Sequence, residues 1–157
     1  MPEPRSSAPK LLLLLFLSFS FLPVPGSEAR QWWRIEIDGY PLDAEVVITD
    51  SEQQLGLGNR FSLPEGQSML FLYEKPGERI FWMKGMYFSI DIIWYRDYTA
   101  VMIEEEVPFP RTPKPDRDLT RYGHGVLADM VLELPAGYIR RHRIEPGHQL
   151  RILNRGQ

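Results

Sequence analysis

Apolar and polar residues alternate with a period of two over residues 33–37 and again over residues 42–48. A β-strand points successive side chains to opposite faces, so this period is typical of a strand that buries one face. Asp38-Gly39 lies between the two stretches, and this dipeptide favours the tight turn of a hairpin. The chain therefore predicts an opening β-hairpin and a fold built mainly of strands.

The rest of the chain continues as short apolar runs separated by turn residues. These runs predict strands over residues 69–73, 80–83, 87–95, 98–103, 130–134 and 149–153. The run 69–73 is apolar throughout, which predicts a strand covered on both faces. Lys75-Pro76-Gly77 predicts a turn after it.

Two short helices are also predicted. Asp50 with Gln53 resembles a capping box, and Gly56 limits that helix to about two turns. Pro135 suits the first turn of the second helix. The fold class is therefore mainly β, with α+β at the margin. We expect one compact small barrel or sandwich of about seven to eight short strands with one or two short helices.

Residues 107–126 differ in character because four prolines fall among several charges. A proline lacks the backbone donor that a central strand requires. This segment is predicted to be a loop, acting as a lid, a binding loop or a mobile excursion.

The N-terminal residues have the pattern of an export signal. Arg5 and Lys10 precede an apolar run over residues 11–22, and small residues precede a cut after Ala29. The run is shorter than the roughly 20 residues that span a bilayer. We predict a signal peptide over residues 1–29, with an uncleaved anchor as the alternative, and a single domain over residues 30–157. The location would be periplasmic or extracellular, and membrane attachment would come only through an uncleaved leader.

Composition narrows the possible functions. The chain has no cysteine, which excludes disulfides, thiolate catalysis and cysteine-based metal sites. Its net charge of −3 does not favour nucleic acid as a partner. The three histidines lack metal-ligand spacing, so no metal and no cofactor are predicted.

Six motifs in order give the chain a family resemblance. They are Gly56–Arg60, Ser68–Phe71, Phe81–Lys84, Ile90–Ile93, Val131–Gly137 and Ile144–Gly147. This order resembles domain-of-unknown-function family 192, whose members are often exported, and covers about residues 33–152. The resemblance implies a compact, mostly β fold and no established activity. It is imperfect, because Gly85-Met86 stand where relatives usually carry Asn-Thr and Ser68 stands where they carry Gly.

Asp91 is the most informative candidate, since it lies among apolar residues of a predicted strand. A buried carboxylate must be paired, hydrogen-bonded or protonated. Lys84 and Arg60 are the motif cations that could meet it. The pair would be either a ligand-facing site or a structural salt bridge that fixes strand register.

Trp82 and Lys84 are expected to share one face of their predicted strand, with Phe81 and Met83 on the other. Lysine is almost never buried without a partner, so the face that carries Lys84 is the expected side of a cleft. An exposed Trp82 would form a stacking platform for a sugar or an aromatic ligand. The alternative places Trp82 in the core.

Glu133 lies between two leucines of a predicted strand. It is either an outward polar residue or an acid–base partner of Asp91, because glycoside hydrolysis uses two carboxylates. The leading hypothesis is a non-catalytic exported module that binds a small molecule, glycan or protein segment through Arg60, Trp82, Lys84, Asp91 and Glu133. The alternatives are a hydrolase of an envelope or extracellular polymer, using Asp91 and Glu133, and a purely structural envelope protein.

Overall fold

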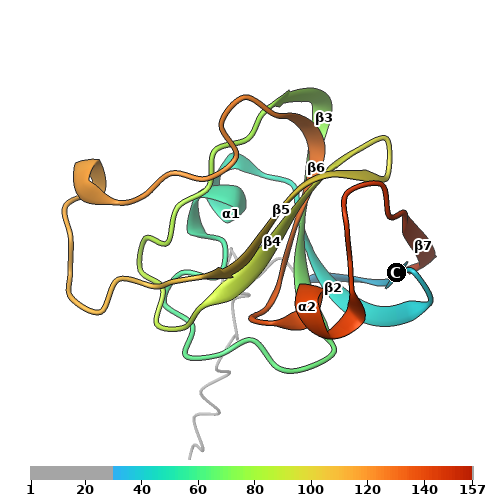
Figure 1. Ribbon diagram of the computed structural model, residues 1–157, viewed down its shortest axis with the longest axis horizontal. Coiled ribbons are helices and arrows are strands. Elements are labelled where there is room, and N and C mark those ends of the chain that lie inside the picture. Colours follow the sequence, from blue (N-terminus) through green and yellow to red (C-terminus); the bar gives the residue numbers. More distant parts are fainter. Residues whose placement is uncertain (1–29, 157) are drawn as a thin grey trace, which may run out of the picture.

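The computed structural model describes residues 30–156, and the predicted signal peptide lies outside this range. Seven strands and two short α-helices make up the domain (Figure 1). The strands are β1 (Gln31–Ile37), β2 (Tyr40–Val47), β3 (Gln67–Glu78), β4 (Ile90–Arg96), β5 (Thr99–Val107), β6 (Leu127–Pro135) and β7 (Leu150–Arg155). The helices are α1 (Asp50–Leu55), α2 (Tyr138–His142) and a single 3-10 turn, η1 (Asp116–Asp118).

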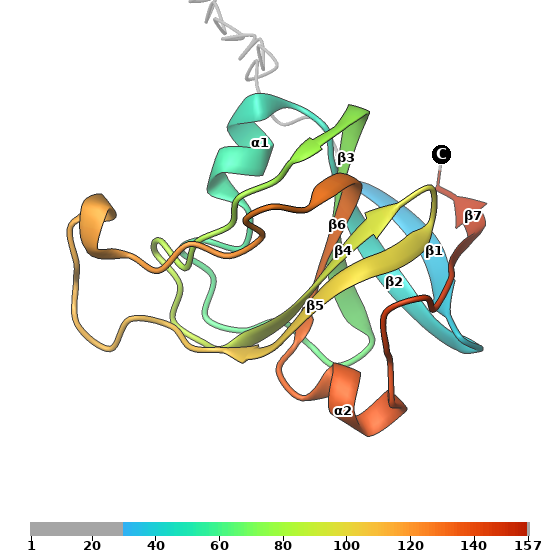
Figure 2. The ribbon, with the colours of Figure 1, turned by 45° about the horizontal axis from the view of Figure 1, so that its top comes forward.

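The strands form one mixed sheet in the order β5-β4-β6-β3-β2-β1-β7. The β2–β3 pairing is parallel, and the other pairings are antiparallel. The two edges approach each other through an isolated bridge between Thr99 and Gln149. The sheet therefore curls strongly without closing into a continuous barrel (Figure 2). This confirms the mainly-β class and the predicted hairpin.

The curled sheet has an apolar core on each face. The inner core includes Ile35, Leu70, Ile93 and Leu132, and α2 contributes to it. The outer core includes Phe71, Ile92, Trp94 and Val131, with cover from the chain that follows α1 and from the two loops 79–89 and 107–126. Both faces of β4, of β6 and of the first half of β3 are consequently covered, as predicted for the apolar run 69–73.

Four local predictions were wrong. Pro135 ends β6 and does not open α2, whose N-cap is Gly137. The segment 80–83 is not a strand, because Phe81 makes only an isolated bridge with Tyr122. Lys75-Pro76-Gly77 lies within β3, where the β3–β6 register shifts between Leu72 and Gly77. The helix α1 is capped one residue earlier than predicted, since Thr49 and Glu52 form the capping box.

The proline-rich segment 107–126 leaves the edge strand β5 and projects to one side of the sheet, where it carries η1 (Figures 1 and 2). Both ends of this loop are fixed. Val107 is buried in the outer core, and Tyr122 exchanges two backbone hydrogen bonds with Phe81. Within the described part of the chain, no helix is long and apolar enough to span a membrane.

Candidate functional site

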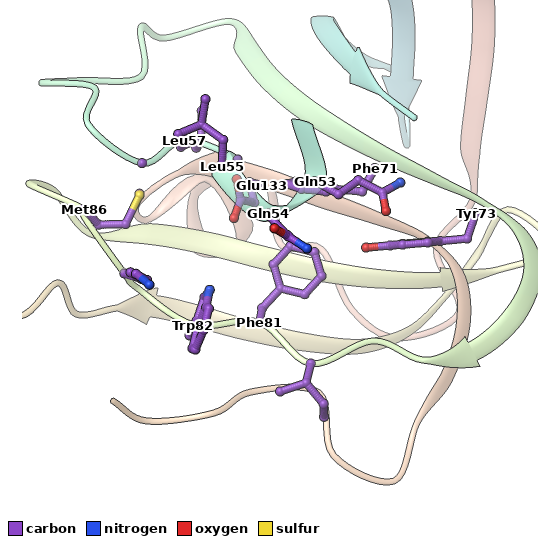
Figure 3. A pocket seen from close by; sticks show the side chains of 14 residues that line it. Gln53, Gln54, Leu55, Leu57, Phe71, Tyr73, Phe81, Trp82, Met86 and Glu133 are labelled. Atoms are coloured by element: carbon purple, nitrogen blue, oxygen red, sulfur yellow. The ribbon is translucent and has the colours of Figure 1, made fainter. Parts of the chain in front are cut away.

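A pocket of about 70 Å³ opens on the outer face of the sheet, between α1 and the loop 79–89. Eight of its fourteen lining residues are aromatic or aliphatic, but the accessible part of the wall is mainly polar, and one carboxyl group lies among the lining side chains (Figure 3). The lining residues are Gln53, Gln54, Leu55, Gly56, Leu57, Gly58, Phe71, Tyr73, Ile80, Phe81, Trp82, Lys84, Met86 and Glu133.

Glu133 points into this pocket because of its register in β6. It lies opposite Met69 of β3 and Ile92 of β4, and both of those side chains belong to the outer core. Glu133 is 5% exposed, and its Oε2 has no hydrogen-bond partner. Burial raises the pKa of its carboxyl to about 8, and the charge of Arg60 opposes part of that rise. Glu133 is therefore mostly a neutral acid at pH 7, and not the outward polar residue that alternation favoured.

Tyr73 contributes a second polar group to the pocket. Its hydroxyl points toward the space occupied by Glu133 and Gln54 (Figure 3). Burial raises the pKa of Tyr73 to about 12, with Arg79 opposing the rise and the charge of Glu133 adding to it. The guanidinium of Arg79 stacks 3.8 Å from the centre of the Tyr73 ring and holds that ring in place.

Trp82 forms one wall and is only partly buried. The guanidinium carbon of Arg121 lies 4.0 Å from its ring centre, and Nζ of Lys84 lies 5.3 Å away. Nζ of Lys84 also binds Oδ2 of Asp116 at 2.7 Å, which ties the pocket wall to the proline-rich loop. Trp82 and Lys84 both line the pocket, in agreement with the prediction that they point to the same side. Phe81 lines it too, because the segment is not a regular strand.

The pocket continues into a shallower depression of about 460 Å³ toward solvent. Gln53, Gln54, Tyr73, Ile80 and Trp82 line both, and the outer depression adds Asp50 and Arg121. The amide nitrogen of Gln53 donates to the carbonyls of Leu72 and Ile48, so this side chain is fixed to the end of β2 and to β3. The two hollows together could therefore hold a ligand that has a small group in the inner pocket and its larger part in the outer depression.

Arg60 does not line the pocket. Its guanidinium donates two hydrogen bonds to the buried carboxylate of Glu45, at 2.7 and 2.8 Å. Glu45 lies across from Met69, which in turn lies across from Glu133, so the two acids share one row on the outer face. Arg60 therefore acts on Glu133 through its charge and not through contact.

Asp91 belongs to a different part of the molecule. It is fully buried and accepts backbone hydrogen bonds from Glu106 at 2.7 Å, Gly137 at 3.0 Å and Ile139 at 2.8 Å. These donors come from the bulge in β5 and from the start of α2. The prediction that Lys84 or Arg60 would pair with Asp91 is wrong, because backbone amides satisfy the carboxylate and both cations have other partners.

Asp91 and Glu133 cannot act on one substrate as a carboxylate pair. Asp91 lies opposite Leu134, whose side chain is in the inner core, whereas Glu133 lies opposite Ile92 of the outer core. The two carboxyl groups therefore project from opposite faces of the same sheet. The geometry that glycoside hydrolysis requires is absent between these two residues.

The sequence missed several residues of the site. Tyr73 ends the apolar run of β3, and Gln54 lies in α1. Neither residue belongs to any of the six sequence motifs. Arg121 stands in the proline-rich loop, 39 positions after Trp82, and nothing in the spacing connects the two residues. No group of three or more potential metal ligands occurs among residues 30–156.

The fold and the pocket together define a mainly-β domain with one buried, unpartnered acid beneath an aromatic wall. The chain belongs to domain-of-unknown-function family 192, described as an uncharacterised family, which matches residues 33–152. This confirms the resemblance inferred from the six motifs. No curated protein sequence matches the chain significantly.

Two solved structures share the fold. A protein from Sinorhizobium meliloti, described only as a candidate transcription regulator, is 25% identical with a TM-score of 0.64, covering 79% of this chain and 94% of that one. A protein of unknown function from Novosphingobium aromaticivorans is 24% identical with a TM-score of 0.68, covering 81% of this chain and 89% of that one.

Proposed function

We propose that the protein is an exported, non-catalytic module that binds a small neutral molecule or the end of a glycan in the pocket formed by Trp82 and Glu133. Export rests on the signal-like composition of residues 1–29. Binding rests on the pocket.

The observation that carries the proposal is the state of Glu133. A buried polar atom without a partner costs free energy, so proteins satisfy nearly all of them. Oε2 of Glu133 has no partner and is itself closed off from solvent, while the residue Glu133 lines a pocket that opens to solvent. A ligand with a hydrogen-bonding group would satisfy it.

The surroundings of Glu133 support binding over catalysis. Acid–base hydrolysis of glycosides uses two carboxyl groups. Glu133 is the sole carboxyl group that lines the inner pocket, and Asp50, which lines the outer depression, is exposed on α1. Serine, threonine and histidine are also missing from the lining, so it offers neither a hydroxyl nucleophile with its base nor a histidine base.

Trp82 supplies the feature that sugars need. The apolar face of a pyranose ring packs on an aromatic ring, and Trp82 lines both the pocket and the outer depression. A sugar stacked there would share the ring with the guanidinium of Arg121 or displace it, since this group lies 4.0 Å from the ring centre. The polar groups of Gln54 and Tyr73 lie on the same side of Glu133, with Gln54 the nearer in this view (Figure 3).

The test is a titration of the full-length chain with monosaccharides, followed by tryptophan fluorescence and by the melting temperature. Binding raises the melting temperature by mass action. The Trp82→Phe variant should weaken binding severalfold. Trp32→Phe is the matched control, since Trp32 is also partly buried but lies outside the pocket lining. Equal effects of the two variants, or no binding of any monosaccharide, would overturn the proposal.

A further inference from the structure

We infer that the inner pocket takes the acetamido group of an N-acetylated sugar, while the sugar ring stacks on Trp82 at the mouth. This inference rests on the proposed function and specifies its ligand class. Three properties of the pocket select this group: its size, the character of its wall and its charges.

Size restricts what can enter. The inner pocket measures about 70 Å³, far less than the outer depression of about 460 Å³. A flat group of a few atoms, such as an acetamido group, suits the inner pocket better than a whole pyranose ring does. The ring would then remain in the outer depression, where Trp82 forms part of the boundary.

The wall matches the two ends of an acetyl group. Leu57, Phe71, Phe81 and Met86 offer apolar surface to a methyl group. The neutral carboxyl of Glu133 is a hydrogen-bond donor, which suits a carbonyl oxygen. The amide N–H of a trans acetamido group points away from its carbonyl. It would thus face the mouth, where Gln54 lines both hollows.

Charge excludes the closest alternatives. An ammonium group would meet Lys84 in the lining and Arg121 at the mouth, and both of these cations already lie over the ring of Trp82. A carboxylate would suffer the same desolvation that keeps Glu133 neutral. Arg60 would not compensate a carboxylate, because its guanidinium is committed to Glu45. A neutral acceptor meets none of these penalties.

The experiment compares three sugars on the full-length chain: N-acetylglucosamine, glucose and glucosamine. We expect N-acetylglucosamine to bind about tenfold tighter than glucose, the effect of one net hydrogen bond and a buried methyl group. Glucosamine should bind more weakly than glucose at pH 6. Equal affinities for N-acetylglucosamine and glucose would overturn this inference and leave the proposed function standing. Tightest binding of glucosamine would overturn the inference as well. If none of the three binds, both fail.

Variants at Glu133 identify the donor. Glu133→Gln keeps a donor and should retain the preference for the acetylated sugar, whereas Glu133→Leu should abolish it. Glu104→Gln is the matched control, because Glu104 continues the same cross-strand row on the edge strand and does not line the pocket. A preference that survives in Glu133→Leu would overturn the inference.

The pH dependence gives a second readout. The preference of the wild type should fall severalfold as the pH rises from 7 to 9, because Glu133 loses its proton. The other titratable or charged groups around the site are Tyr73, Lys84, Arg60, Arg79, Asp50 and Arg121, and Glu133→Gln retains them all. A preference independent of pH in the wild type, or an equal fall in Glu133→Gln, would contradict the role of the carboxyl proton.

Discussion

The carboxylate of Glu45 accepts two parallel hydrogen bonds from the guanidinium of Arg60, at 2.7 and 2.8 Å. Glu45 is buried on β2, so this pair fixes the loop after α1 against the sheet. The loop in turn forms the side of the pocket at Leu57 and Gly58. The pair therefore supports the wall of the pocket, although neither Glu45 nor Arg60 lines the pocket itself.

We expect Arg60→Lys to destabilise the fold by about 1–2 kcal/mol, because a lysine cannot donate both bonds and leaves part of a buried carboxylate unpaired. Urea unfolding measures the loss. Arg34→Lys is the control, since Arg34 makes one bond of 2.7 Å with the exposed Asp43 and should change stability by less than about 0.5 kcal/mol. If both variants lost the same free energy of unfolding, the buried Arg60–Glu45 pair would contribute no more to stability than the exposed Arg34–Asp43 pair, contrary to this prediction.

Glu133 should make the stability of the wild type depend on pH. Its pKa rises from 4.5 to about 8 on folding, so the folded state binds the proton more tightly. The stabilisation from this proton is complete below pH 4.5 and is lost as the pH rises through 8. Glu133→Gln removes the ionisable group. We compare the free energy of unfolding of the variant with that of the wild type at each pH. We expect the difference, variant minus wild type, to be a few kcal/mol larger at pH 9 than at pH 4.5.

Denaturant unfolding at a series of pH values checks this expectation. The Glu104→Gln variant provides the reference curve, since Glu104 is only partly buried and has no part in the pocket. Parallel curves for the wild type and Glu133→Gln would show that Glu133 ionises in the folded state as it does in the unfolded chain.

Much of the fold could be predicted from the sequence, because alternation and turn residues are local signals. They located the hairpin β1–β2 and the apolar core strands, and the two glycines after Leu55 limited α1. The strand prediction for residues 80–83 failed because the apolar residues of this segment pack individually on the outer core without a partner strand. The turn predicted at Lys75-Pro76-Gly77 is instead a bulge in β3, and it was mistaken for a turn because proline and glycine are typical turn residues.

The site was less accessible to sequence reasoning. Trp82, Lys84 and Glu133 were identified, and they line one pocket. The partner of Asp91 could not be found, since backbone amides provide it and every residue type except proline carries one. The burial of Glu133 was also hidden, because both faces of β6 are covered and alternation then does not separate buried from exposed positions.

Asp91→Asn should destabilise the protein by about 2–3 kcal/mol. Oδ2 of Asp91 accepts from the amide of Ile139, and an amide nitrogen placed there would oppose one donor with another. Asp91→Ala should cost more, because it also leaves the amides of Glu106 and Gly137 unsatisfied. Thermal and urea unfolding measure both. The exposed Asp43→Asn variant serves as the control. Wild-type stability of Asp91→Asn would remove the structural role assigned to this carboxylate.

The ion pair between Lys84 and Asp116 should affect the motion of the proline-rich loop and not the stability of the domain. Both side chains are about half exposed, so the pair contributes at most about 1 kcal/mol. In Asp116→Asn we expect faster hydrogen exchange at the amides of Asp118 and Leu119, which close the 3-10 turn η1. Exchange at Phe81 and Tyr122 should stay slow, because their paired bonds anchor the end of the loop in the outer core. The Asp118→Asn variant is the control, since Asp118 pairs with Arg117 within the loop itself. Unchanged exchange in Asp116→Asn, or a global loss well above 1 kcal/mol, would show that this pair does not act as the tether between the loop and the pocket wall.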